Sequence, residues 1–161
     1  MVKLRELALS SAGKIVLHSM PGRKELWAEA KAALLQYEIS HVLCLNDASE
    51  IDEKSPEYGQ AIKQGGFVDH FIQLPVTDFS VPDDIQSYRR QIHAIALDVE
   101  KGAHLLIHCA AGVGRTGCAA MAVLQELGFS EHEAREKVLA AGSTPETAEQ
   151  WAFIESYQTV N

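Results

Sequence analysis

The sequence has no long apolar run, few cysteines and more acidic than basic residues. No segment reaches 18 uninterrupted apolar residues, so we expect none to span a membrane. The opening stretch MVKLRELALSSAGK has charges spread through it and lacks the apolar core of a secretory signal. Three cysteines are too few, and odd in number, for a disulfide framework, which indicates a reducing cytoplasmic setting.

The shortage of basic residues excludes two classes of partner. Fourteen Lys and Arg residues stand against 22 Asp and Glu residues, which gives a formal net charge of −8. Nucleic acid and anionic membranes attract basic surfaces, so we expect neither as a partner, and any bound anion needs a local site. The 161 residues, 47% of them hydrophobic, predict one domain over 1–161 with a substantial core, and we expect a monomer.

Strand-like and helix-like patterns alternate along the chain. β-rich runs occur at 14–20, 41–46, 68–76 and 103–109, and the run at 4–9 is expected to form a hairpin with the first of these. Helical spacing predicts helices at 21–37, 85–99, 114–127, 130–141 and 145–158, with Ser80 and Asp83 as a capping box before the second. This alternation predicts a single α/β domain whose central, mainly parallel sheet of about five strands is flanked by helices.

The stretch LLIHCAAGVGRTG, residues 105–117, joins an apolar strand to a helix. In a parallel sheet, ligands bind beyond the carboxyl ends of the strands, often at a helix N-terminus. Small residues let the backbone between them curl with successive N–H groups pointing inward. The residues predicted to bind phosphate in this way are Ala110, Ala111, Gly112, Val113, Gly114 and Arg115.

Three side chains suit this loop to nucleophilic attack on a bound phosphate group. A helix N-terminus and a nearby arginine favour the reactive thiolate form of a cysteine, here Cys109. The planar fork of Arg115 matches two phosphate oxygens, and the hydroxyl of Thr116 can hydrogen-bond the sulfur. The alternative is that Cys109 is an ordinary core residue at the end of a strand. The glycines, Thr116 and the following helix favour the functional interpretation.

HCAAGVGRTG resembles the signature of cysteine-dependent protein tyrosine and dual-specificity phosphatases, which is His-Cys, five residues, Arg, then Ser or Thr. The segments IVLHSMPGRK, VLCLNDASEI and TAEQWAFI extend the resemblance over nearly the whole chain, in the order of the compact kinase-associated phosphatase type. The resemblance implies phosphomonoester hydrolysis through a cysteinyl-phosphate intermediate, with no cofactor and no metal. His104 and His108 would in any case stand about 13 Å apart along a strand, too far for one metal ion.

Phosphoryl transfer also needs a proton for the departing oxygen, and the predicted general acid is Asp78 in LPVTDFSVPDD. TDFSVP resembles the acid-bearing loop of the same phosphatases. Asp78 is alternatively a turn-capping residue. Asp83 and Asp84 are rival acids, although they fit better as favourable charges in the first turn of the next helix.

The resemblance suggests a residue for the second half-reaction, in which water attacks the phosphocysteine. Classical tyrosine phosphatases use a Gln-Thr-x-x-Gln pattern, and the matching stretch here is ETAEQ, 146–150. Glu146 replaces the first glutamine and Gln150 matches the second. Gln150 is alternatively a helix-surface residue, with Asp78 then serving as the base.

Several functions other than a protein phosphatase fit part of the pattern. A rhodanese-like domain shares the cysteine loop but has no use for the Asp loop, and a non-catalytic phosphoprotein-binding domain would typically have lost Cys109 or Asp78. An inositol-phosphate or phosphoinositide phosphatase is the main active rival. The uncharged Ala110, Ala111 and Val113 favour a monophosphorylated substrate, either a phosphorylated protein or a small phosphomonoester. The short chain favours a dual-specificity pocket.

Cys44 ends the strand HVLCLN, which in related folds neighbours the strand leading to the cysteine loop. A nearby thiol can trap an oxidised Cys109 as a disulfide. The alternatives are that Cys44 is only a core residue, or that Cys118 is the partner.

Overall fold

The computed structural model describes residues 2–10 and 12–159, and residues 1, 11, 160 and 161 of the predicted domain lie outside this part of the chain. It is an α/β structure around one five-stranded sheet with strand order β1-β2-β5-β3-β4. The strands are β1 (Arg5–Glu6), β2 (Lys14–His18), β3 (His41–Cys44), β4 (His70–Gln73) and β5 (His104–His108). The pairing of β1 with β2 is antiparallel and the other pairings are parallel, as the sequence predicted.

The parallel pairing brings the functional residues to one edge of the sheet. In register, His108 on β5 lies beside both His18 on β2 and Cys44 on β3. The central strands are apolar and buried on both faces, which is typical of parallel strands covered by helices on either side. The loops that follow β2, β3 and β5 therefore leave the sheet next to one another, at its carboxyl end.

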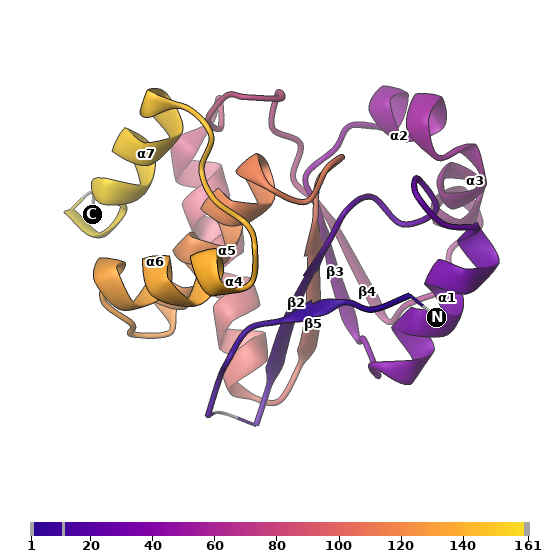
Figure 1. Cartoon of the computed structure of the whole chain (residues 1–161), viewed down its shortest axis with the longest axis horizontal. Coiled ribbons are helices and arrows are strands. Elements are labelled where there is room, and N and C mark those ends of the chain that lie inside the picture. The colour runs from indigo at the N-terminus through magenta and orange to yellow at the C-terminus, as the bar shows by residue number, and fades with distance from the viewer. Residues whose placement is uncertain (1, 11, 160–161) are drawn as a thin grey trace.

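Helices cover both faces of the sheet (Figure 1). One side carries α1 (Trp27–Gln36), α2 (Ala48–Lys54) and α3 (Pro56–Gln64). The other carries α4 (Ile85–Glu100), α5 (Gly114–Glu126), α6 (Glu131–Ala140) and α7 (Ala148–Glu155), followed by a single 3₁₀ turn, Tyr157–Thr159. None of the helices in the described ranges is both long and apolar enough to cross a membrane.

The predicted helix at 114–127 is the most buried helix of the domain. Every residue of α5 from Gly114 to Gln125 is buried, and the helix contacts β5, α4, α6 and α7. A Cβ added at Gly117 would lie 2.8 Å from backbone atoms of Thr144, so glycine allows the loop before α7 to approach. This close packing fixes the N-terminus of α5 beside the end of β5.

Some predicted boundaries are wrong. The helix predicted at 21–37 begins only at Trp27, because Gly22 adopts a left-handed turn with φ of 81°. The capping box of Ser80 and Asp83 is absent: the cap is Asp84, whose carboxylate accepts the N–H of Ser87. An aspartate at the N-cap position accepts a hydrogen bond from a backbone N–H that has no partner within the helix. This explains why Asp84, and not Ser80, caps α4.

Two helices and a shortened strand also depart from the predicted pattern. The periodicity did not predict α2 or α3, although Asp47 as N-cap and Pro56 at a first helical position are ordinary start signals. The strand predicted at 68–76 is regular only over His70–Gln73, as β4. Leu74 and Val76 still donate to the carbonyls of Cys44 and Leu45, and the chain then continues as the loop that carries Asp78.

Candidate active site

Cys109 lies at the junction predicted for a phosphate-binding loop. It follows the last residue of β5, and α5 begins five residues later at Gly114. Its side chain is nearly enclosed, since the residue is 2% exposed, and the hydroxyl of Thr116 donates a hydrogen bond to its sulfur at 3.1 Å. The structure thus brings Cys109, Thr116 and the start of α5 together, and the sulfur lies at the positive end of a buried helix.

The backbone of the loop is held by contacts that only small residues permit. Gly112 has φ of 76°, and a Cβ there would lie 2.5 Å from the carbonyl oxygen of His18. Any other residue would therefore be strained in conformation and would also clash with β2. The carbonyl of Ala110 accepts a hydrogen bond from the N–H of Met20 at 3.1 Å.

His108 supports the loop from inside the core. Burial lowers the pKa of His108 to about 4, so the ring is neutral near pH 7. Its Nδ1 lies 3.2 Å from the carbonyl oxygen of Cys109, which only accepts, so Nδ1 carries the proton. Nε2 then accepts from the hydroxyl of Tyr58 at 2.8 Å. Tyr58, from the unpredicted α3, is a supporting residue that the sequence pattern did not reveal.

Arg115 is almost completely buried and has three protein partners. Nη1 donates to Oε1 of Glu50 and to the carbonyl of Val76, both at 2.9 Å, and Nη2 donates to Oε2 of Glu50 at 3.0 Å. Oδ1 of Asp78 lies 3.4 Å from Nη2. The Nε–H of Arg115 is buried without a hydrogen-bond partner among the described residues. The guanidinium therefore stands between the cysteine loop and the Asp78 loop.

Glu50 is the strongest electrostatic partner of Arg115. Hydrogen bonds from Arg115, opposed by burial and reinforced by Asn46 and Lys54, lower the pKa of Glu50 to about 2. Burial alone would lower the pKa of Arg115, but the bonds and charge of Glu50 raise it overall. Glu50 lies in the segment VLCLNDASEI, where no sequence pattern predicted a role for it. Its place just beyond the carboxyl end of β3, the neighbour of β5, was the available signal.

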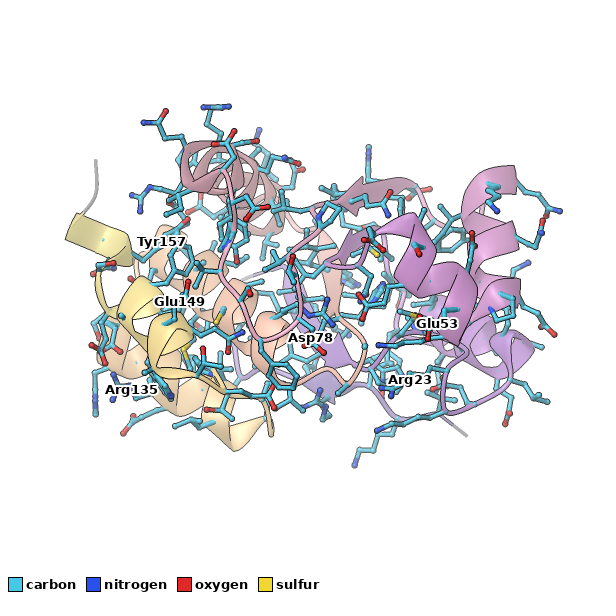
Figure 2. The ribbon with its side chains drawn as sticks, turned by 90° about the horizontal axis from the view of Figure 1, so that it is seen from above. Arg23, Glu53, Asp78, Arg135, Glu149 and Tyr157 are labelled. Atoms are coloured by element: carbon cyan, nitrogen blue, oxygen red, sulfur yellow. The ribbon has the colours of Figure 1, made fainter. Side chains whose placement is uncertain are left out.

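Asp78 lies on the loop between β4 and α4, near the middle of the face onto which the strands open (Figure 2). Its side chain is 48% exposed, and Oδ1 accepts the N–H of Phe79 at 3.0 Å. Phe79 has φ of 60° and is 57% exposed. Such a conformation costs a bulky residue about 1–3 kcal/mol and is typically found near functional sites.

A polar cleft of about 450 Å³ opens beside Asp78 and Glu50. Most of the ionisable side chains that line it are acidic. Its lining comprises Asp47, Glu50, Lys54, Pro75, Val76, Thr77, Asp78 and Asp83. Asp83, one of the rival acids, thus borders the same cleft, whereas Asp84 is occupied as the cap of α4.

Gln150 is buried at the start of α7, so it is not a helix-surface residue. Its Oε1 accepts the N–H of Glu146 at 2.7 Å, and its Nε2 donates to the carbonyl of Ser80 at 3.1 Å. Ser80 is two residues beyond Asp78, so Gln150 ties the Asp78 loop to α7. Glu146 lies against the first turn of α5: a Cβ added at Gly114 would meet its Oε1 at 2.2 Å.

Cys44 pairs in register with His108, the residue before Cys109, so the two strand ends are adjacent as predicted. Cys44 is fully buried, and burial raises its pKa to about 12. Burial likewise raises the pKa of Cys118 to about 12. All three cysteines are free thiols here, and a disulfide between Cys109 and Cys44 stays a prediction.

Solved structures of known phosphatases have the same fold. Kinase associated phosphatase, in a form with its catalytic-site cysteine replaced by serine, has a TM-score of 0.83 and 18% identity over 98% of this chain and 94% of that one. Tk-PTP in its active form gives 0.72 and 21% identity over 98% of both chains. Human DUSP28 gives 0.69 and 19% identity over 98% and 95%. No curated protein sequence matches the chain.

The fold and the cysteine loop define a cysteine-dependent phosphatase of the protein tyrosine phosphatase fold. Residues 13–156 match the family described as PTP-SAK, Swiss Army Knife protein, DSP-PTPase phosphatase domain. The chain belongs to this family of dual-specificity-type phosphatase domains.

The pair of Glu50 and Arg115 predicts a specific pH dependence of stability. The folded pKa of Glu50, about 2, lies below its ordinary 4.5, so its stabilising contribution is complete above pH 4.5 and is lost as the pH falls through 2. We expect Glu50→Gln to lower the free energy of unfolding at pH 7 by about 1–3 kcal/mol, because it weakens the partner of a buried charge. Urea unfolding measured from pH 7 to 2.5 should show that this difference in the free energy of unfolding becomes smaller below pH 4.5.

The control is Glu53→Gln, on the exposed side of the same helix (Figure 2), which should leave stability nearly unchanged at every pH. If the difference in the free energy of unfolding between Glu50→Gln and wild type stayed constant down to pH 2.5, Glu50 would not titrate as the structure implies.

Proposed function

We propose that this phosphatase works as a single domain over 1–161 and transfers the phosphoryl group of its substrate to Cys109, forming a cysteinyl-phosphate. The observation that carries the proposal is the enclosed Cys109 sulfur, which accepts a hydrogen bond from Thr116 at the N-terminus of α5. A thiol in that electrostatic environment is suited to act as a nucleophile. The backbone from Ala110 to Gly114 would hold the phosphate oxygens.

In the proposed first step, the Cys109 thiolate attacks phosphorus and the bond to the ester oxygen breaks. Asp78, protonated, gives its proton to the departing oxygen, which leaves as an alcohol or phenol. Arg115 would bind two equatorial oxygens through its fork, and its Nε–H is a buried donor that a phosphate oxygen would satisfy. The position of Asp78, 3.4 Å from the same guanidinium, supports its role at the edge of the phosphate site.

In the proposed second step, water attacks the cysteinyl-phosphate and the sulfur–phosphorus bond breaks. The Asp78 carboxylate accepts the proton of the water, phosphate leaves, and Thr116 stabilises the departing thiolate through its hydrogen bond. The sequence predicted that Gln150 orients this water. Its bond to Ser80 supports a second role, in which Gln150 holds the loop that carries Asp78.

We propose that the substrate is a phosphorylated protein with phosphotyrosine or phosphothreonine. The uncharged side chains of Ala110, Ala111 and Val113, and the predominantly acidic cleft, disfavour inositols with several phosphates, because each extra phosphate would meet carboxylates. We further propose that the protein is a monomer and that it acts in the reducing cytoplasm. The three free thiols support the second of these points.

Replacing the proposed nucleophile should separate binding from turnover. We expect Cys109→Ser to abolish hydrolysis of para-nitrophenyl phosphate while tungstate still binds within about threefold of wild type, since the backbone and Arg115 hold the anion. Turnover and equilibrium binding of tungstate are the two measurements. A serine variant that kept more than a few per cent of the wild-type rate would show that Cys109 is not the nucleophile.

Removing the proposed general acid should affect poor leaving groups most. Asp78→Ala should lower kcat by about 10²–10⁴ for a phenyl phosphate with a poor leaving group, and by less for one with a good leaving group.

Asp83→Ala is the matched control for Asp78→Ala, since it removes a carboxylate from the same cleft. Equal losses for good and poor leaving groups in Asp78→Ala, together with selective losses in Asp83→Ala, would assign the acid to Asp83. A third variant, Gln150→Ala, distinguishes the two roles proposed for Gln150. If Gln150 acts by holding the Asp78 loop, this variant should lose more activity on poor leaving groups than on good ones, as Asp78→Ala does, but by less. If phosphoenzyme accumulates instead, Gln150 acts in the step in which water attacks the cysteinyl-phosphate.

A substrate panel distinguishes the protein phosphatase from its alternatives. We expect kcat/KM for phosphotyrosine and phosphothreonine peptides to exceed that for inositol hexakisphosphate and phosphoinositides by at least about tenfold, because carboxylates line the cleft. Phosphate release measures all four. A preference for the inositol compounds would favour the alternative substrate class, and binding of phosphopeptide without release would favour a binding domain.

A further inference from the structure

An arginine at the edge of the sheet supports the cysteine loop from behind. Arg5 lies on β1, and its Nη2 donates to the carbonyl oxygen of Gly112 at 2.7 Å. Its Nη1 donates to the carbonyl of Ala141 and to the hydroxyl oxygen of Ser143, both at 2.9 Å. Ser143 in turn donates to the same Gly112 carbonyl at 2.7 Å. One carbonyl of the loop therefore accepts two hydrogen bonds from residues outside it.

These bonds determine where the loop's N–H groups point. A peptide unit is planar and trans, so its C=O and its N–H point in opposite directions. Fixing the Gly112 carbonyl toward Arg5 and Ser143 therefore fixes the N–H of Val113 in the opposite direction. The N–H of Met20 fixes the peptide of Ala110 and Ala111 in the same way. The orientation of these two peptide units of the loop is thus fixed through their carbonyls.

The three acceptors around Arg5 match the shape of a guanidinium. Its two terminal nitrogens reach Gly112, Ala141 and Ser143 together, which an ammonium on a flexible chain does not reproduce. The turn at Gly142 leaves room for the guanidinium of Arg5, because φ there is 89° and a Cβ would lie only 3.2 Å from Nη1. Arg5 thereby joins β1, the cysteine loop and the segment between α6 and α7.

The charge of Arg5 also interacts electrostatically with Cys109. Burial lowers the pKa of Arg5, and the electrostatic effect of Cys109 opposes that change. Arg5 is therefore a second cation, besides Arg115, whose charge acts on Cys109. Donors that are in place before an anion arrives require no reorganisation when it binds.

We propose that Arg5 is a positioning residue for phosphate binding, which acts through the Gly112 carbonyl and does not touch the substrate. The proposal rests on the function proposed for the same loop. It predicts a loss of affinity for phosphate-like anions that exceeds the loss of kcat, because the N–H donors bind ground state and transition state alike while Cys109 and Asp78 stay in place.

The test compares Arg5→Met, Arg5→Lys and Arg135→Met with wild type. Equilibrium binding of tungstate should weaken by about tenfold or more in Arg5→Met, the scale of one charge-assisted hydrogen bond, with KM for para-nitrophenyl phosphate rising more than kcat falls. Arg5→Lys should recover part of the affinity. Arg135→Met removes the same charge from α6, away from Asp78 (Figure 2), and should bind tungstate as wild type does.

Ser143→Ala provides a second measurement that does not depend on the folding of the Arg5 variants. It removes the other hydrogen-bond donor to the Gly112 carbonyl, so it should also weaken tungstate binding, but by less than Arg5→Met does. Wild-type affinity for tungstate in both Arg5→Met and Ser143→Ala would overturn the role of Arg5. A wild-type protein that neither binds tungstate nor hydrolyses phosphate esters would overturn the proposed function itself, which is a different result.

Discussion

The buried charge of Arg115 is the constraint around which the site is built. Arg115 is only 4% exposed, so its guanidinium has lost most of its water, and such a charge is tolerated only with a partner. Glu50 provides that partner through two hydrogen bonds, and the carbonyl of Val76 provides a third acceptor. These partners reach Arg115 from helix α2, which follows β3, and from the loop after β4, so the pairing also holds three strand ends in one arrangement.

The pairing leaves Arg115 able to take a further anion. Glu50 accepts one N–H from each terminal nitrogen, which leaves the second N–H of Nη2 and the Nε–H as the fork for a phosphate. The Nε–H is buried without an acceptor among the described residues. In the proposed reaction a phosphate dianion would supply that acceptor at the end of α5, where the loop N–H groups and the helix also favour negative charge. Glu50 then keeps the guanidinium oriented through the whole cycle, and it need not move when substrate arrives.

The part of this site that lies within one stretch of sequence could be predicted from that stretch, and the family resemblance added Asp78 and Gln150. The residues that hold the loop from elsewhere in the chain could not be predicted. Cys109, Thr116 and the small residues between them are contiguous, so their chemistry and their place after a buried strand are evident from the sequence. The alternation of strands and helices likewise predicted the sheet and its mainly parallel order. The capping of α4 was misassigned because Ser80, Asp83 and Asp84 all offer an oxygen at a plausible spacing, and only the packed structure selects Asp84.

The missed residues support the loop from distant parts of the chain. Glu50, Tyr58 and Arg5 are 65, 50 and 107 residues from the groups they hold. No local pattern marks them, because an isolated Glu, Tyr or Arg is ordinary in a helix or at a sheet edge. The parallel register brings the ends of β2, β3 and β5 together, and the antiparallel pairing of β1 with β2 adds Arg5; only this sheet arrangement makes them neighbours.

An acidic protein that binds an anion must confine its positive potential to one place. The net charge of −8 repels phosphate compounds at long range, but at physiological ionic strength charges farther than about 8 Å are largely screened. Close to Cys109, the N-terminus of α5 and the cations Arg115 and Arg5 act on an enclosed space with little solvent, where their effect is strongest. Outside that space, the carboxylates that line the cleft make the electrostatic potential negative. The proposed site therefore favours one phosphate group on a carrier with little further negative charge. That combination describes a phosphorylated side chain better than a highly phosphorylated small molecule.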